Sequence, residues 1–304
     1  MKDVGVLAQN IDEQACLGTL SEMVQCKSYS ETEGERTLAI RMVEIMSEMG
    51  LEAYLQPVEG NRVNAIGIWR GTGGGKSLLF NGHLDTNPVS EGWTVDPWGG
   101  LVDEKFIYGI GVSNMKAGDA ASLCAVQTLI QNGKRLKGDI ILTYVVGELQ
   151  GGVGTYAAIQ AGIRADYFIN SEPTDLQALT MHADAFVFTI ELTGITRHMS
   201  KREEAVDAIR AACDLVPQLS DMTFSDAPSR EHRRINRVHI GTIRGALGQS
   251  FEEWRPPQVA DFARLTGSGR IGPGQSKANA LKDFRRVLDG LEANWPGLKA
   301  DVRI

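Results

Sequence analysis

A histidine and an aspartate two residues apart are the first side chains in this sequence whose types and spacing suggest chemistry. His83 and Asp85 lie in NGHLDT, where the apolar run SLLF gives way to polar residues. A metal-bound histidine usually donates its second ring N–H to a carboxylate, which fixes the tautomer of the imidazole. His83 and Asp85 are therefore candidates for a metal ligand and the residue that orients it, although H-x-D also occurs in ordinary surface turns.

Two further carboxylates follow apolar segments. Glu148 comes after DIILTYVVG and before a glycine-rich turn, and Glu172 lies in SEPT after DYFIN. A carboxylate in such a position could act as a general base if its pKa is raised. Taken singly, however, Glu148 is better explained as an ordinary loop residue, and the position of Glu172 is no more specific.

The segment YGIGVSNMKAG joins a glycine-rich turn to a helical pattern. Asn114 precedes Met115, where we expect the helix to begin. Asparagine is a favoured N-cap residue because its side-chain oxygen accepts a hydrogen bond from a free backbone N–H of the first turn. By residue type alone, Asn114 is predicted to cap this helix.

The elements that must position these residues alternate between strands and helices. Such alternation predicts βαβ units and a parallel-rich sheet flanked by helices. In sheets of this kind the chemistry collects in the loops at the carboxyl ends of the strands, where His83, Glu148 and Glu172 are expected. The predicted helices span 33–50, 115–133 and 151–162, and the predicted strands span 51–58, 62–70, 77–86, 139–148 and 166–174.

The pattern changes near residue 183, where we expect a domain boundary between residues 1–183 and 184–304. The second part has the order β-α-β-β-α-β, which is typical of a ferredoxin-like α+β domain. Its predicted strands span 185–194, 236–245, 259–271 and 298–304, and its predicted helices span 203–219 and 276–295.

The composition excludes several classes of partner. The chain has 304 residues, with 31 Lys and Arg against 38 Asp and Glu, and a net charge of −7. A nucleic-acid phosphate backbone requires a basic face, so the acidic balance argues against that partner. There is no apolar stretch long enough for a membrane span, and the first residues do not resemble a targeting segment. The four cysteines are widely spaced, as expected for reduced thiols in a cytoplasmic protein.

Taken in order, GHLDT, YGIGVSNMKAG, GELQGGVGT, SEPT and GITRHMSKREEAVDAI resemble the co-catalytic zinc amidohydrolase and peptidase family. This family includes acetylornithine deacetylase, succinyl-diaminopimelate desuccinylase and aminoacylase, and the resemblance covers essentially the whole chain. It implies a zinc-exopeptidase-like α/β domain and a ferredoxin-like lid or dimerisation domain. It also implies that the catalytic-type domain lacks its C-terminal part, about a hundred residues that hold a last zinc-binding histidine.

The resemblance assigns roles to particular residues. His83 matches a zinc ligand and Asp85 the residue that orients it. Asn114 stands where the family has an aspartate that bridges two zinc ions. Glu148 matches the general base, and Leu149 stands where the family has a glutamate ligand. A shifted alignment would instead make Glu148 the ligand and leave the base unassigned.

Three further residues receive roles in the same way. Glu172 matches the acidic zinc ligand of the E-P-T motif. His198 matches a histidine that reaches the active site of the dimer partner, which implies a homodimer through residues 184–304. Arg270, in GSGRIGPG, could hold a substrate carboxylate bidentately, although a surface ion pair explains it slightly better.

The departures from the family pattern restrict the metal centre. A neutral asparagine offers one oxygen, and leucine offers no donor atom, so Asn114 and Leu149 cannot replace two anions around a pair of Zn²⁺ ions. We therefore expect at most one Zn²⁺ or similar divalent ion, with His83, Glu172 and a weakly binding Asn114 as ligands.

Three functions remain open on these residues. The first is a metal-dependent hydrolase of amide bonds in N-acylated amino acids or small peptides. The second is a metal-independent enzyme in which Glu148 and the His83–Asp85 pair act as acid–base groups. The third is a ligand-binding pseudoenzyme that has kept the fold and lost the chemistry. Retention of His83, Asp85, Glu148, Glu172 and His198 favours a working pocket.

Overall fold

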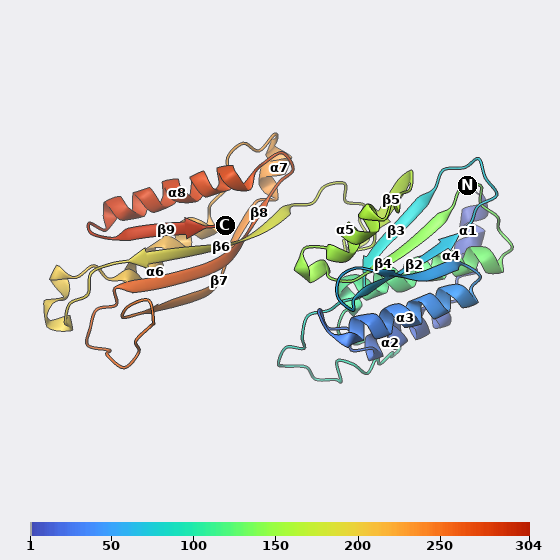
Figure 1. The fold of residues 1–304 in the computed structure, drawn as a ribbon, viewed down its shortest axis with the longest axis horizontal. Helices are drawn as coiled ribbons and strands as arrows, with labels where there is room; N and C mark the ends of the chain where they lie inside the picture. The colour runs from blue at the N-terminus through green and yellow to red at the C-terminus, as the bar shows by residue number, and fades with distance from the viewer. Residues whose placement is uncertain (1) are drawn as a thin grey trace. The chain divides into compact units, whose positions relative to one another are not determined.

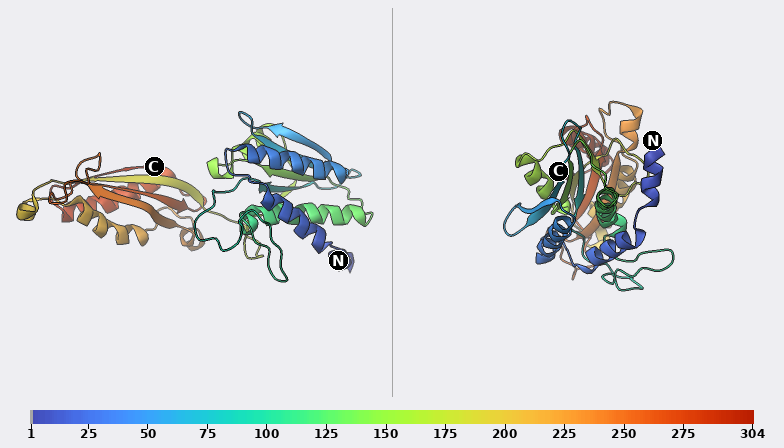
Figure 2. Two further views of the ribbon diagram at one scale, coloured as in Figure 1. Left: turned by 90° about the horizontal axis from the view of Figure 1, so that it is seen from below. Right: turned by 90° about the vertical axis from the view of Figure 1, so that its right-hand side faces the viewer.

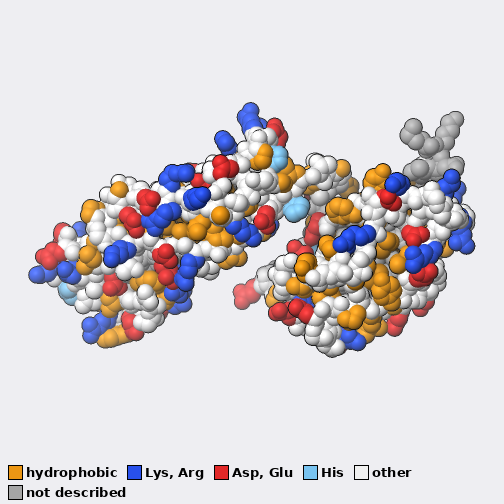
Figure 3. Space-filling view, turned by 45° about the horizontal axis from the view of Figure 1, so that its top comes forward, with side chains coloured by type: hydrophobic (Ala, Val, Ile, Leu, Met, Phe, Trp, Pro, Cys, Tyr) orange, Lys and Arg blue, Asp and Glu red, His pale blue; other side chains and the backbone are white. Residues whose placement is uncertain are grey.

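The computed structural model describes residues 2–304. Its chain divides after Gln177 into two compact units, the second of which begins at Ala178 (Figure 1). The sequence pattern placed this division at about residue 183. No helix in the described part of the chain is both long enough and apolar enough to cross a bilayer. Lys, Arg, Asp and Glu side chains are interspersed over the face drawn in Figure 3.

The first unit is built on a five-stranded sheet of order β1-β2-β4-β3-β5. β3 pairs in parallel with β4 and β5, whereas β1–β2 and β2–β4 are antiparallel. The expectation of a parallel sheet is therefore correct for only half of the pairings. The short turn between β1 and β2 can join only antiparallel neighbours, whereas the helical crossovers allow the parallel ones. The strands are β1 Glu52–Pro57, β2 Val63–Trp69, β3 Leu78–His83, β4 Ile140–Val145 and β5 Tyr167–Asn170.

One face of this sheet is covered by α3 and α4, and α2 packs against α4 (Figure 2). Buried residues of all three helices share one hydrophobic core with the sheet. α3 buries Leu38, Met42 and Met46, whose spacing places them on one helical face. The opposite face carries α5, which contacts β2 and β4. The helices of this unit are α1 Lys2–Gln9, α2 Glu13–Gln25, α3 Glu33–Glu48, α4 Ala117–Gln131 and α5 Val153–Gln160.

The start of α4 differs from the prediction. Residues 112–116 form a single π-helical turn after Gly111, whose φ of +83° is left-handed, and Asn114 has non-helical angles of φ −118° and ψ −119°. Asn114 therefore does not cap a helix at Met115, and α4 begins only at Ala117. The reason is a tertiary contact, because the buried Lys116 Nζ donates to the backbone carbonyls of Met23 and Cys26 at 2.7 and 3.3 Å.

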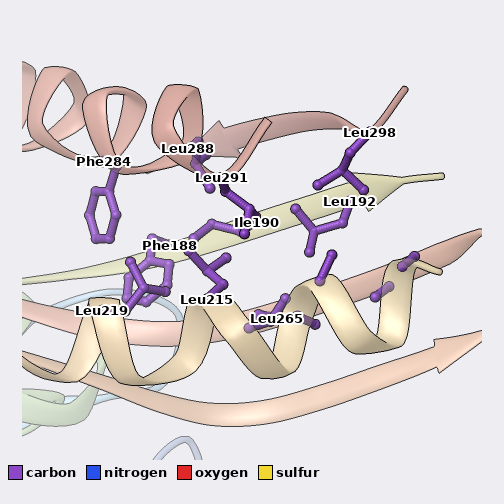
Figure 4. Close-up of a cluster of buried hydrophobic side chains, with 14 of the residues drawn as sticks. Phe188, Ile190, Leu192, Leu215, Leu219, Leu265, Phe284, Leu288, Leu291 and Leu298 are labelled. Atoms are coloured by element: carbon purple, nitrogen blue, oxygen red, sulfur yellow. The ribbon is translucent and has the colours of Figure 1, made fainter. Parts of the chain in front are cut away.

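The second unit has a four-stranded antiparallel sheet of order β7-β8-β6-β9. Its two long helices, α6 and α8, bury their apolar sides against this sheet. Side chains such as Phe188, Leu215 and Phe284 meet in the core between the helices and the sheet (Figure 4). The elements are β6 Asp184–Thr193, α6 Ala208–Ser220, β7 Arg237–Ala246, β8 Phe262–Ile271, α8 Lys277–Asn294 and β9 Lys299–Arg303, with short helices η3 Met199–Glu204 and α7 Arg230–Arg234.

The predicted helix 203–219 is wrong at its beginning. Asp207 is the N-cap of α6, and its carboxylate accepts hydrogen bonds from the amides of Ile209 and Arg210 at 3.0 and 3.1 Å. The preceding residues 199–204 form the 3-10 segment η3. An aspartate inside the apolar periodicity thus delays the start of the helix to residue 208, since its side chain binds the free backbone N–H groups of the first turn.

Candidate active site

His83 is the last residue of β3, and its side chain is buried, with 3% of its surface exposed. Its Nδ1 donates to the backbone carbonyl of Asp85 at 2.9 Å and lies 3.5 Å from the Asp85 carboxylate. Its Nε2 lies 3.2 Å from Glu172 Oε1, but the geometry of this contact is not that of a hydrogen bond, so this buried nitrogen has no hydrogen-bond partner. The predicted partners His83, Asp85 and Glu172 are therefore together, and Nε2 is available to a ligand.

The surroundings of His83 are strongly negative. Burial alone would lower the pKa of the imidazole, but the carboxylates of Asp85 and Glu172 outweigh burial and raise that pKa to about 10. A field that favours a proton on this ring also favours a metal cation beside it.

Asp85 joins the end of β3 to the turn that carries Glu148. Its buried carboxylate accepts hydrogen bonds from Ser30 Oγ at 2.7 Å and from the amides of Glu148 and Leu149 at 3.2 and 3.4 Å. Burial would raise the pKa of Asp85, but the contacts with His83 and these donors lower it to about 2. Asp85 therefore accepts a hydrogen bond from His83 at its backbone carbonyl, while its carboxylate lies beside the imidazole and holds the Glu148 turn.

The Glu148 turn is a 3-10 segment, η2 Glu148–Gln150, at the carboxyl end of β4. Gly147 and Gly151 flank it with φ of +76° and +83°, a left-handed conformation that glycine adopts without a Cβ clash. The side chain of Glu148 is exposed. The turn thus presents a carboxylate to solvent while its backbone is bound to Asp85.

A buried ion pair supports the same turn from behind. The guanidinium of Arg62 donates to both carboxylate oxygens of Glu35 at 2.8 Å, and its Nη2 also donates to Gln150 Oε1 at 3.1 Å. The side chain of Glu35 is fully buried. The sequence analysis did not predict this pair. Glu35 shares a helical face with Leu38 and Met42, and a charged residue on an apolar face indicates a buried ion pair.

Asp119, in the first turn of α4, was also missed. It is 1% exposed, and neither of its carboxylate oxygens has a hydrogen-bond partner. Burial raises the pKa of Asp119 well above its ordinary value. The signal in the sequence is an acidic residue within an otherwise apolar helical run, AGDAASLCAV.

The side chains of the remaining predicted residues are not among these contacts, although the amide of Leu149 donates to Asp85. Asn114 and Leu149 are exposed. His198 and Arg270 belong to the second unit, where His198 Nδ1 lies 3.0 Å from Ser200 Oγ. The side chain of Arg270 is exposed and forms no ion pair within residues 2–304, so the surface ion pair expected for it is wrong.

The candidate donor atoms of this site can be compared with what a metal ion needs. Within residues 2–304, no three His, Cys, Asp or Glu side chains stand close enough to surround a metal ion together. The buried Nε2 of His83 and Oε1 of Glu172 nevertheless face each other, and both buried oxygens of Asp119 lack a hydrogen-bond partner. An imidazole nitrogen and a carboxylate oxygen are donors that divalent metal ions accept, so these atoms are the candidate ligands of this site.

A protein-family model, described as peptidase family M20/M25/M40, matches residues 79–239, which is more than half of the chain. The chain belongs to this family. The succinyl-diaminopimelate desuccinylase 2 of a Ruegeria species is 30% identical over 210 residues, which cover 64% of this chain and 52% of the relative. The acetylornithine deacetylase of Aliivibrio fischeri is 26% identical over 290 residues, covering 91% of this chain and 73% of the relative. The chain thus spans about half of the first relative and about three quarters of the second.

Solved structures support the same fold. A tripeptidase from Staphylococcus aureus superimposes with a TM-score of 0.68 at 21% identity, covering 96% of this chain and 75% of that one. An M20 family metallo-carboxypeptidase from Sulfolobus solfataricus superimposes with a TM-score of 0.65 at 18% identity, covering 94% of this chain and 77% of that one. At these identities the likeness establishes the fold alone.

Proposed function

We propose that the protein hydrolyses amide bonds in N-acylated amino acids or small peptides, with at most one metal ion at His83 and Glu172. One observation carries the proposal: Asp85 orients the buried His83 and binds the backbone of Glu148. The candidate ligand and the candidate base are therefore held by one residue, which binds His83 through its backbone carbonyl and the Glu148 amide through its carboxylate. The named activities of the two curated relatives, a desuccinylase and a deacetylase, agree with this substrate class.

The single-metal part of the proposal rests on donor chemistry. Two adjacent Zn²⁺ ions repel each other and need anionic ligands between and around them. Asn114 offers a neutral amide at the bridging position, and Leu149 offers no donor atom at the other. His83 and Glu172 remain as protein ligands of one ion.

The residues then divide the reaction between them. A bound divalent ion would polarise the scissile carbonyl as a Lewis acid. Glu148 accepts a proton from the attacking water, whose oxygen bonds to the carbonyl carbon, and returns the proton to the amine as the carbon–nitrogen bond breaks. Asp85 keeps His83 in one tautomer throughout.

The test combines turnover with metal content. The purified protein is assayed on N-acetyl and N-succinyl amino acids and on di- and tripeptides, before chelation, after chelation and after Zn²⁺ is returned. We expect turnover that chelation abolishes and Zn²⁺ restores, with no more than one metal per chain by mass spectrometry. Turnover by metal-free protein would favour the metal-independent enzyme. Tight binding without turnover would favour the pseudoenzyme, and two bound metals would refute the single-metal site.

The second unit is proposed to act as a lid and dimerisation domain, residues 184–304, with His198 acting in the partner's site. We expect a homodimer by light scattering and a loss of turnover of about 10²-fold for His198→Ala, the scale of one lost transition-state hydrogen-bond donor. His182→Ala changes an exposed histidine that lies just before these residues, in the unit that begins at Ala178, and should leave turnover unchanged. A strict monomer would remove His198 from the catalytic residues.

A further inference from the structure

We propose that Asp119 is an anionic member of the metal site, and that it supplies the negative charge that Asn114 lacks. The carboxylate of Asp119 would stabilise a cation held by His83 and Glu172 through one water, since the three side chains do not stand close enough to surround an ion directly. This inference rests on the metal binding that the proposed function includes, and not on hydrolysis itself.

The first support is that Asp119 is buried without a partner. Both of its carboxylate oxygens are inaccessible to water and accept no hydrogen bond. Burying an unpaired carboxylate costs several kcal/mol, so buried charges in proteins are normally paired or bound to metal ions. An acid retained in such a place calls for a cation nearby.

The second support is its position. A Cβ at Gly82 would overlap Asp119 Oδ1, and a Cβ at Gly118 would overlap the backbone carbonyl of Ser171. These two glycines let α4 approach β3 and the segment before Glu172 closely. The carboxylate of Asp119 consequently lies against Gly82, the residue before His83. Its helix packs against Ser171, the residue before Glu172.

The third support is that the nearby lysine is already engaged. Lys116 is 1% exposed, and its Nζ donates to the carbonyl oxygens of Met23 and Cys26. Asp119 forms no ion pair with Lys116 or with any other described residue. A divalent ion beside His83 would supply the missing positive charge.

The experiment measures Zn²⁺ binding by calorimetry and the melting temperature of the metal-free protein. Asp119→Asn keeps the shape and removes the charge. We expect it to weaken Zn²⁺ binding about 10–100-fold, the range for residues that support metal ligands. The same change should raise the melting temperature of the metal-free protein, because an unpaired carboxyl no longer has to be buried. Opposite effects on metal binding and apo stability are the signature of this role.

Asp283→Asn is the matched control, because Asp283 is a buried aspartate of the second unit that accepts hydrogen bonds from Ser225. It should lower the melting temperature and leave Zn²⁺ affinity unchanged. Should Asp119→Asn fail to fold, Asp119→Ser is measured in the same way.

Unchanged Zn²⁺ affinity in the folded Asp119 variant would overturn the inference, as would a wild-type protein that binds no Zn²⁺ at millimolar concentration. Zn²⁺ binding that depends on Asp119, in a protein that hydrolyses none of the tested substrates, would support the inference while the proposed hydrolysis fails. The two failures are therefore distinguishable.

Discussion

Replacing Glu148 with glutamine should lower turnover by about 10²–10⁴-fold, the usual contribution of a general base. The change keeps the size of the side chain and removes its ability to accept a proton from water. Glu148 is exposed on η2, and the turn is bound through its backbone amide to Asp85. The variant should therefore fold normally, and the loss should appear in kcat rather than in KM.

The measurement is steady-state kinetics on the substrate that the wild-type protein turns over, together with Zn²⁺ titration. Glu104→Gln, another exposed glutamate of the first unit, serves as the control and should behave as wild type. Unchanged turnover in Glu148→Gln would exclude Glu148 as the base. A loss of Zn²⁺ affinity instead of kcat would identify Glu148 as a metal ligand, as in the shifted alignment.

Replacing Arg62 with methionine should lower the free energy of unfolding by about 3–5 kcal/mol, because it leaves the buried carboxylate of Glu35 without its ion-pair partner. Arg62 binds both oxygens of Glu35, whose side chain is fully buried, and no other cation pairs with Glu35 in the described chain. The loss also removes the donor to Gln150, so the turn that carries Glu148 should loosen.

Urea unfolding followed by circular dichroism measures this effect. Arg41→Met is the control, since Arg41 pairs with Glu22 and Glu44 at the surface and should contribute no more than about 1 kcal/mol. The double variant Glu35→Leu, Arg62→Met removes both charges and should recover most of the lost stability. A double variant as unstable as Arg62→Met alone would show that the lost packing of the side chain, and not the stranded charge, causes the effect.

Much of the secondary structure could be predicted because it depends on local periodicity. The apolar spacing over 33–50 predicted α3, observed as Glu33–Glu48, and the alternation over 185–194 predicted β6, observed as Asp184–Thr193. Both patterns report which side of an element faces the core, and that information is contained in neighbouring residues.

The errors arose where a distant contact overrides a local preference. Asn114 has the residue type of a helix cap, but the buried Lys116 reaches the backbone carbonyl of Met23, 93 residues earlier, and the turn around Asn114 is irregular. Strand direction was misjudged for a related reason, since the pairing of β2 with β4 depends on the whole sheet and not on either strand.

By itself, the sequence determined the family, most helices and strands, and the residue types His83, Asp85, Glu148 and Glu172 that could carry the chemistry. Only the tertiary structure decided how these residues are supported. Ser30 binds Asp85 across 55 residues and Arg62 binds Glu35 across 27, whereas Asp119 is left without a partner. The physical reason is that the energy of a buried charge depends on which distant groups surround it, and folding alone brings those groups together.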